Sequence, residues 1–280
     1  MLERGRFLNN SQRFYEETAM KRRDFGKLGL AVSALALGGS VMAAQTQTVS
    51  SEKNTALDQI LARLTERDIP QHVGYDKRMI ALITTATLTA LGAETLLADQ
   101  IRQALAAGIK PLQLREAMYQ GFAYVGIARV SEAEKVLAAQ MKAVGLGDQI
   151  EDATVVNDRD RFDKGLAIQK GIFGEAIDQI HKSARPDERY LNVDLLTGYC
   201  FGDTYTRTGL TLKERELLTF VFIAAMGGCE PQVKAHAGGN ISVGNTRKML
   251  IDALVVMLPY IGFPKTLNAL AMVNEAAPAK

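Results

Sequence analysis

Residues 108–126 read GIKPLQLREAMYQGFAYVG, and residues 244–262 read GNTRKMLIDALVVMLPYIG. The two stretches align without a gap: glycine, leucine, alanine, tyrosine and a final glycine coincide, and Glu116 matches Asp252. In each stretch, a glycine suited to stop a helix is followed by a long apolar helix that ends in Tyr-x-Gly. The chain therefore contains an internal repeat. One copy is too small to close a core, so we expect the two copies to pack side by side.

Helical patterns surround both copies. Apolar residues at positions 57, 60, 61 and 64 fall on one face of a first helix, which Pro70 is expected to end. Further helices are predicted over residues 76–91, 94–106, 111–125, 131–143, 165–181, 188–196, 212–226, 230–241, 246–258 and 264–275. The sequence contains no run of alternating apolar and polar residues and no Asn-Gly hairpin turn, so it predicts no strand. The expected fold class is all-α, with two tandem helical repeats.

The composition is typical of a globular protein and narrows the choice of partners. The 280 residues are 47% hydrophobic and carry a formal net charge of +2, with basic and acidic residues intermixed, so we expect no nucleic acid partner. Cys200 and Cys229 are too few for a disulfide framework, and the three histidines show no metal-ligand spacing. We therefore expect no metal ion and no other cofactor, and a small molecule as the substrate.

The N-terminal segment has the anatomy of an export signal. Residues 20–44 read MKRRDFGKLGLAVSALALGGSVMAA: a basic start, an uncharged apolar stretch and small residues at the end. The pair Arg22-Arg23 resembles a twin-arginine motif. We expect residues 1–50 to hold an N-terminal extension, with Met20 as a candidate start, and a signal peptide for export to the periplasm. No stable membrane anchor is expected after its removal; the alternative is an uncleaved N-terminal anchor.

Two repeats joined by a charged linker are expected after the signal peptide. Residues 51–150 are assigned to a first, degenerate repeat and residues 163–280 to a second repeat. The linker, residues 151–162, contains the charged run NDRDR, which is typical of a solvated connection between apolar helical blocks.

Short motifs in the second repeat follow one another in a distinctive order. They are FGDTY at 201–205, RELL at 215–218, CEPQVKAH at 229–236, VGNT at 243–246 and YIGFP at 260–264. In this order they resemble the carboxymuconolactone decarboxylase family. The resemblance covers residues 160–275 well and residues 75–140 weakly.

The resemblance implies an assembly and two kinds of chemistry. Members of this family form all-α bundles that assemble as trimers or hexamers. A chain with two copies is therefore expected to form a homotrimer that resembles a hexamer of single copies. The family contains cofactor-free decarboxylases of lactone acids and thiol peroxidases of the alkylhydroperoxidase D type.

The decarboxylase interpretation assigns a role to several side chains of the second repeat. Arg215 would clamp the departing carboxylate through two parallel hydrogen bonds. His236 would deliver a proton to the carbanion that remains, while Glu216 would hold the imidazole in one tautomer or shuttle a proton itself. Gln232 and Tyr260 are expected to contact the substrate, a small lactone or keto acid.

The peroxidase alternative depends on Cys229. Family peroxidases carry Cys-x-x-Cys-x-x-x-His on one helix and a glutamate on the preceding helix, which matches Cys229, His236 and Glu216. The second cysteine position is Gln232, which cannot act as a nucleophile, and Cys229 lies about 10.5 Å along the helix from His236. We therefore prefer a decarboxylase or a related proton-transfer enzyme. The alternatives are a thiol-dependent peroxidase with Cys200 as the resolving thiol, and a ligand-binding assembly protein without catalysis.

Each of these residues also has a purely structural interpretation. Arg215 and Glu216 would then form a solvated ion pair at a helix start, Cys229 would be a small packed residue, and His236 a core histidine with satisfied hydrogen bonds.

The first repeat lacks most of the site. The positions that match the cysteine and histidine of the second repeat are Gly92 and either Asp99 or Gln100. With one gap, Arg78 matches the arginine, whereas Met79 replaces the glutamate. We interpret the first repeat as a structural partner that can lend residues to a site between subunits.

Overall fold

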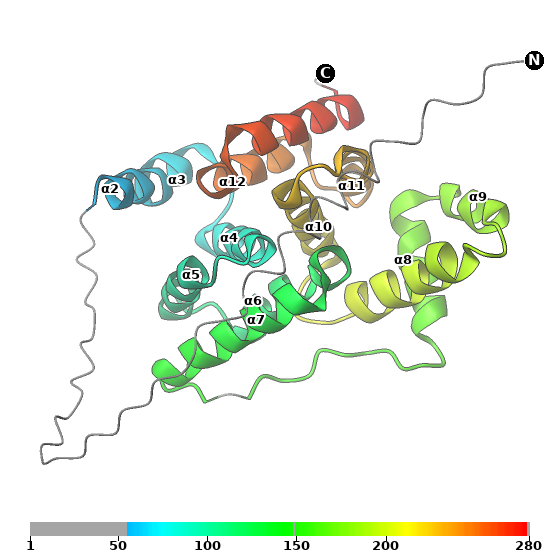
Figure 1. Ribbon diagram of the computed structural model, residues 1–280, viewed down its shortest axis with the longest axis horizontal. Helices are drawn as coiled ribbons and strands as arrows, with labels where there is room; N and C mark the ends of the chain where they lie inside the picture. Colours follow the sequence, from blue (N-terminus) through cyan, green and yellow to red (C-terminus); the bar gives the residue numbers. More distant parts are fainter. Residues whose placement is uncertain (1–54, 148, 279–280) are drawn as a thin grey trace, which may run out of the picture. The chain divides into compact units, whose positions relative to one another are not determined.

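The computed structural model describes residues 55–147 and 149–278. The predicted signal peptide within residues 1–50 lies outside this part of the chain. Every regular element within the described ranges is a helix (Figure 1). The all-α prediction is therefore confirmed.

The helices fall into two series along the chain. The first is α2 (Ala56–Ala62), η2 (Arg63–Asp68), α3 (Ile69–His72), α4 (Lys77–Leu91), α5 (Glu94–Ala106), α6 (Pro111–Tyr119) and α7 (Phe122–Ala143). The second is α8 (Arg161–Phe173), α9 (Ala176–Ser183), η3 (Tyr190–Tyr205), α10 (Leu212–Met226), α11 (Glu230–Ser242) and α12 (Arg247–Ala276). The two elements labelled η are π-helical, with wider turns than an α-helix. Helix α8 begins inside the predicted linker, residues 151–162.

Local sequence signals set the starts of the two central helices. The Asp76 carboxylate accepts a hydrogen bond from the backbone N–H of Met79 and caps α4, and Thr211 forms a capping box with Glu214 at the start of α10.

Pro70 does not end the first helical segment, which continues to the end of α3. The proline lies in the first turn of α3, where a missing N–H is tolerated.

In both repeats the long helix is kinked at a glycine in an equivalent position. Gly126 in α7 (φ 80°, ψ 162°) and Gly262 in α12 (φ 73°, ψ 168°) kink their helices at equivalent positions. Both need a positive φ, which glycine adopts without strain. The copies differ at Gln120 and Gly121, where a turn separates α6 from α7. The single helix predicted over residues 111–125 is therefore wrong, whereas its counterpart in α12 runs unbroken to the kink.

A basic residue after each kink caps the central helix of its own repeat. Arg129 donates a hydrogen bond to the carbonyl of Ala90 at 2.6 Å, and Lys265 donates to the carbonyl of Ala225 at 2.7 Å. Both carbonyls lie at helix C-termini, where cations are favoured. The equivalence of these contacts shows that the repeat extends beyond the aligned stretches.

A single hydrophobic core joins the two repeats. Helices α4 and α10 pack against each other, and α12 packs on both (Figure 1). Their inward side chains are almost completely buried, including Leu82, Ile83, Phe220, Phe222 and Met257. Burial of each such side chain stabilises the fold by about 1.5–3 kcal/mol, and here much of it depends on the other repeat.

Helices α8 and η3 form a closely packed pair. A Cβ atom added to Gly165 would overlap the carbonyl of Thr197, and one added to Gly202 would overlap the carbonyl of Arg161. The backbones therefore touch where only glycine fits. Helix η3 runs to Tyr205, beyond the predicted range of 188–196, because its last turns pack in a second apolar cluster with α8.

Among the described helices, α12 is long and apolar enough to cross a membrane by length and composition. Its buried face, however, packs on α10 and α11, and the kink at Gly262 divides it. In this structure α12 is a core helix.

Candidate functional site

A buried carboxylate and a histidine form the centre of the site. Glu216 Oε1, in the first turns of α10, lies 2.7 Å from His236 Nδ1 on α11. The Glu216 side chain is fully buried, and 12% of the His236 side chain is exposed. The approach depends on Gly239, because a Cβ atom there would overlap Glu216 Oε1.

The imidazole of His236 is held on several sides. The rings of Phe173 and Tyr124 stand edge-on to it, with centroids 5.4 and 5.7 Å away. Asn240 donates hydrogen bonds to the backbone carbonyls of both Glu216 and His236, which ties α10 to α11. Because Nδ1 faces the carboxylate, Nε2 is the nitrogen left to meet a substrate.

Tyrosine hydroxyls cover the other carboxylate oxygen. Tyr205 donates a hydrogen bond to Glu216 Oε2 at 2.6 Å, and its oxygen lies 2.7 Å from Thr219 Oγ1 and 3.4 Å from the Tyr124 hydroxyl. Burial raises the pKa of both tyrosines well above the ordinary value. They are therefore neutral hydrogen-bond donors near neutral pH.

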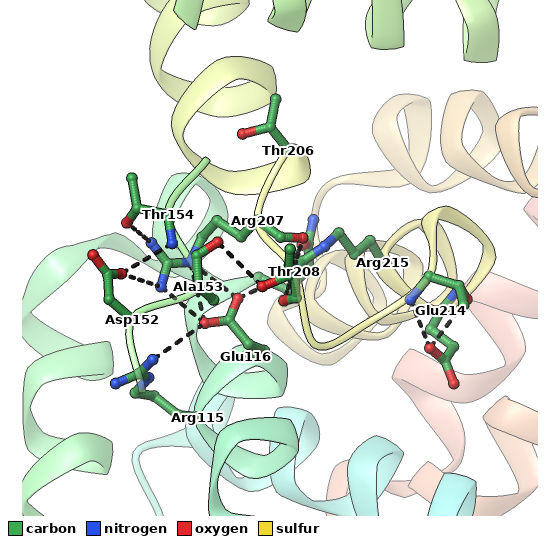
Figure 2. A network of polar contacts seen from close by, with 12 residues as sticks. Arg115, Glu116, Asp152, Ala153, Thr154, Thr206, Arg207, Thr208, Glu214 and Arg215 are labelled. Carbon is green, nitrogen blue, oxygen red and sulfur yellow. Dashed lines mark hydrogen bonds and ion pairs between the residues drawn. The ribbon is translucent and has the colours of Figure 1, made fainter. Parts of the chain in front are cut away.

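Arg215 lies in the core and does not face a substrate. Its side chain is fully buried; it donates to Glu116 Oε2 at 3.0 Å, to Gln120 Oε1 at 3.0 Å, and to the carbonyls of Arg207 and Thr208 (Figure 2). The expected carboxylate clamp is therefore replaced by an ion pair with the first repeat. Sequence analysis treated Arg215 as accessible, either as a carboxylate clamp or in a solvated ion pair, because its buried partners Glu116 and Gln120 lie far away in the sequence.

Glu116 forms ion pairs with three arginines, two of them through hydrogen bonds. It accepts hydrogen bonds from Arg207 at 2.9–3.1 Å on one side and from Arg215 on the other, and Arg115 lies 3.8 Å away (Figure 2). Its side chain is fully buried. A buried carboxylate of this kind needs such partners, since unpaired burial of its charge costs several kcal/mol, on the order of 3–5.

The two cysteines are free thiols in different surroundings. Cys229 is half-buried at the start of α11, with Sγ 3.6 Å from the carbonyl of Gly227. Cys200 is buried, and its Sγ donates a hydrogen bond to the Tyr124 hydroxyl at 3.4 Å. Burial raises the pKa of Cys200 to about 12, so the reactive thiolate is scarce near neutral pH.

The remaining predicted residues lie apart from the Glu216–His236 pair. Gln232 is exposed on α11. Tyr260 is hydrogen-bonded to Thr84 of α4, on the side of the first repeat. Its repeat equivalent, Tyr124, lies beside His236 instead. The two long helices thus each present their tyrosine to the other repeat, and the repeat alignment is the sequence signal that pairs these two positions.

The structure also fixes the register between the repeats. Helices α5 and α11 have the same length, and their starts match His236 with Gln100. Helices α4 and α10 also have the same length, and their starts match Arg78 with Lys213 rather than with Arg215. Arg78 instead forms an ion pair with Glu214 at 2.6 Å.

The main contributors missed by sequence analysis are Tyr124, Tyr205, Thr219 and Gln120. Tyr124 and Gln120 come from the first repeat, so that repeat lends residues to the site within one chain. Sequence motifs could not locate them, because their contacts depend on how α7 crosses α10 and η3.

A shallow hollow of about 450 Å³ borders the site between α8 and α11. Its lining includes Lys170, Phe173, Gly239 and Ser242. Phe173 and Gly239 also touch the Glu216–His236 pair, so the hollow offers space for a small substrate beside this pair. No group of three or more potential metal ligands gathers within residues 55–147 and 149–278.

Comparison with known proteins gives matches to both repeats. The model of the carboxymuconolactone decarboxylase family matches residues 56–139 and 192–275. Nitrosuccinic acid decarboxylase of Metarhizium robertsii is 27% identical over 115 residues, which are 41% of this chain and 79% of that protein. The 4-carboxymuconolactone decarboxylase of Acinetobacter baylyi is 24% identical over 123 residues, 43% of this chain and 89% of that protein.

Proposed function

Because the chain belongs to the carboxymuconolactone decarboxylase family, we propose that it removes carbon dioxide from a small lactone acid or keto acid, with His236 as the proton carrier. The observation that carries the proposal is the 2.7 Å contact between Glu216 Oε1 and His236 Nδ1, which leaves Nε2 directed away from the carboxylate. Both relatives with curated names are decarboxylases, although their identities to this chain are low.

The chemistry requires one proton for each turnover. When the bond to the carboxylate breaks, carbon dioxide leaves and its electron pair stays on the substrate, delocalised toward a carbonyl group. Protonated His236 gives its Nε2 proton to that carbon, and the imidazole takes a new proton from water. Glu216 holds Nδ1 through its hydrogen bond, so that Nε2 is the nitrogen that gives and takes the proton.

The cation that attracts the substrate is Lys170 in this proposal. Arg215 is occupied in the core, whereas Lys170 lines the hollow next to the site. Its ammonium lies 2.6 Å from Asp178, and both side chains are more than a third exposed. Such an exposed pair is weak, so a substrate carboxylate can compete for the lysine.

Carbon dioxide release tests the proposal. The candidate substrates are 4-carboxymuconolactone and nitrosuccinic acid, given to the native protein, to His236→Gln and to His72→Gln. We expect release by the native protein, a loss of about 100-fold or more in kcat for His236→Gln, and no loss for His72→Gln. His72 is an exposed histidine whose ring contacts only the carbonyl of Asp68, so it controls for the substitution itself.

Two results would contradict the proposal. Release that His236→Gln leaves intact would remove His236 from the mechanism. Failure of the native protein to act on either acid would remove these substrates, and peroxide consumption that Cys229→Ser abolishes would establish the thiol peroxidase alternative.

The assembly and the export expected from the sequence belong to the same proposal. Light scattering on the protein from residue 51 onward is expected to give three chains per particle, and a monomer would contradict the trimer. Processing near Ala44 in periplasmic extracts would test export.

A further inference from the structure

Four hydrogen bonds connect the core arginine to the site carboxylate. Arg215 donates to Gln120 Oε1 at 3.0 Å, and Gln120 Nε2 donates to Thr219 Oγ1 at 3.0 Å. Thr219 lies 2.7 Å from the Tyr205 hydroxyl, which donates to Glu216 Oε2 at 2.6 Å. All five side chains are at most 3% exposed.

The two ends of this chain fix the direction of every bond. A guanidinium can only donate, so the oxygen of Gln120 must face Arg215 and its NH₂ group must face Thr219. An ionised carboxylate can only accept, so the single proton of Tyr205 points to Glu216. Thr219 then donates to Tyr205. The result is a hydrogen-bond relay, Arg215–Gln120–Thr219–Tyr205–Glu216, in which each of the three inner members accepts a hydrogen bond from the arginine side and donates one toward Glu216.

We propose that this relay holds the Glu216 carboxylate in place against His236, which makes Gln120 and Thr219 positioning residues of the site. Aligned hydrogen bonds polarise one another, and the low dielectric of a buried chain strengthens each of them. The inference deepens the proposed function and rests on it, and it gives the first repeat, through Gln120, a working part in the site of the second.

Apart from its partner His236 on α11, the groups that face Glu216 are Tyr205 and Cys200 on η3, and Tyr124 on α7. Burial and the nearby carboxylate raise the pKa of Tyr205, and burial raises that of Cys200 to about 12. Near neutral pH the two tyrosines and the thiol are therefore uncharged. Beyond His236, the cation that hydrogen bonds connect to Glu216 is Arg215.

The test compares two substitutions of Thr219 that differ in whether the hydroxyl group is kept. Thr219→Val keeps the shape of the side chain but removes the hydroxyl, whereas Thr219→Ser keeps the hydroxyl. The readouts are kcat and KM, together with the chemical shift of the His236 Cε1 resonance in the free protein at fixed pH, assigned with His236→Gln. In Thr219→Val we expect this resonance to move and kcat to fall by about 10-fold while KM stays within about twofold. In Thr219→Ser we expect the resonance and kcat to stay near their native values.

A second variant keeps the test decisive if Thr219→Val fails to fold. Gln120→Met breaks the relay from the first repeat, and Arg215 retains Glu116 and two carbonyls as partners. It should give the same change in the His236 resonance and the same loss of kcat, while KM stays within about twofold.

The outcomes separate this inference from the proposed function. An unchanged His236 resonance in folded Thr219→Val or Gln120→Met would overturn the relay, whatever the activity. A shifted resonance in a protein that decarboxylates neither substrate would support the relay and overturn the assigned reaction.

Discussion

Gly238 and Gly239 are neighbours on α11 that face different surroundings. A Cβ atom on Gly239 would overlap Glu216 Oε1 and lie 2.9 Å from a methyl group of Ile172, whereas one on Gly238 would meet nothing within 4 Å. The first glycine of the pair is thus replaceable, and the second is required by the close approach of Glu216 to His236.

This contrast gives a matched pair of alanine substitutions. Gly239→Ala should push Glu216 away from His236 and lower kcat by about 10- to 100-fold, because small displacements at a reacting centre are costly. Gly238→Ala should leave kcat unchanged and raise stability by about 0.5–1 kcal/mol, since alanine is the better helix former. Because Gly238 also lines the hollow beside the site, any effect of this substitution on activity should appear in KM. Steady-state kinetics and thermal unfolding check both. Equal losses in the two variants would show that Gly239 serves only the packing of α11.

Single residues could be selected from the sequence only in part. Motif order singled out Glu216 and His236, and the structure brings these two together, although their catalytic role stays a prediction. The placements of Arg215 and Tyr260 were not predictable. Burial of Arg215 depends on Glu116 from the other repeat, and Tyr260 is directed toward that repeat by the crossing of α12 over α4.

At the scale of elements, an ion pair links the starts of the two central helices. Arg78 on α4 lies 2.6 Å from Glu214 on α10, with the two side chains 30% and 16% exposed. Burial alone would raise the pKa of Glu214, but the hydrogen bonds from Arg78 and Thr211 outweigh it, and the pKa is lowered. Glu214 therefore contributes stability that is present above the unfolded-state pKa of glutamate and is lost as pH falls through the lower folded-state value.

We expect Glu214→Gln to lower the free energy of unfolding by about 1 kcal/mol at pH 7. Glutamine retains the capping position but not the charge, so the difference from the native protein should shrink below about pH 4. Urea unfolding across pH measures it. The control is Glu132→Gln, which removes an exposed pair with Lys135 and should change stability by less than about 0.5 kcal/mol. A pH-independent loss in Glu214→Gln would assign the effect to the cap alone.

Helix bounds were predictable where their signals are local. The predicted limits of α4, α5, α10 and α11 agree with the structure within about one residue, because caps, prolines and glycines mark these ends. The extension of η3 and the break between α6 and α7 were not predictable. Tertiary packing decides them, through the contact of η3 with α8 and of Gly121 with the ring of Phe222.

At the scale of the whole molecule, each repeat braces the other through an equivalent acid. Glu116 binds Arg207 and Arg215, which flank the loop before α10. Asp252, its counterpart, accepts a hydrogen bond from the backbone N–H of Gly74, in the loop before α4, at 2.9 Å. The arrangement is reciprocal but unequal. Glu116 is fully buried between two cations, whereas the Asp252 side chain is 9% exposed and its ionic partner, Lys248, is 68% exposed.

Because Glu116 and Asp252 differ in burial, neutralising each carboxylate is expected to lower the free energy of unfolding by a different amount. Glu116→Gln keeps the shape but leaves the buried Arg215 without a counter-charge and leaves Arg207 only the exposed Asp152 at 3.9 Å, so it should lower the free energy of unfolding by about 3–5 kcal/mol. Asp252→Asn should cost about 1 kcal/mol, because it weakens one hydrogen bond and a solvated pair. Both variants should unfold in urea in a single transition, since the repeats share one core.

Equal losses in the free energy of unfolding would mean that the contacts of Glu116 and those of Asp252 stabilise the fold to the same extent. A second transition would mean that each repeat folds as an independent unit, and the first repeat would then be dispensable for holding the site of the second.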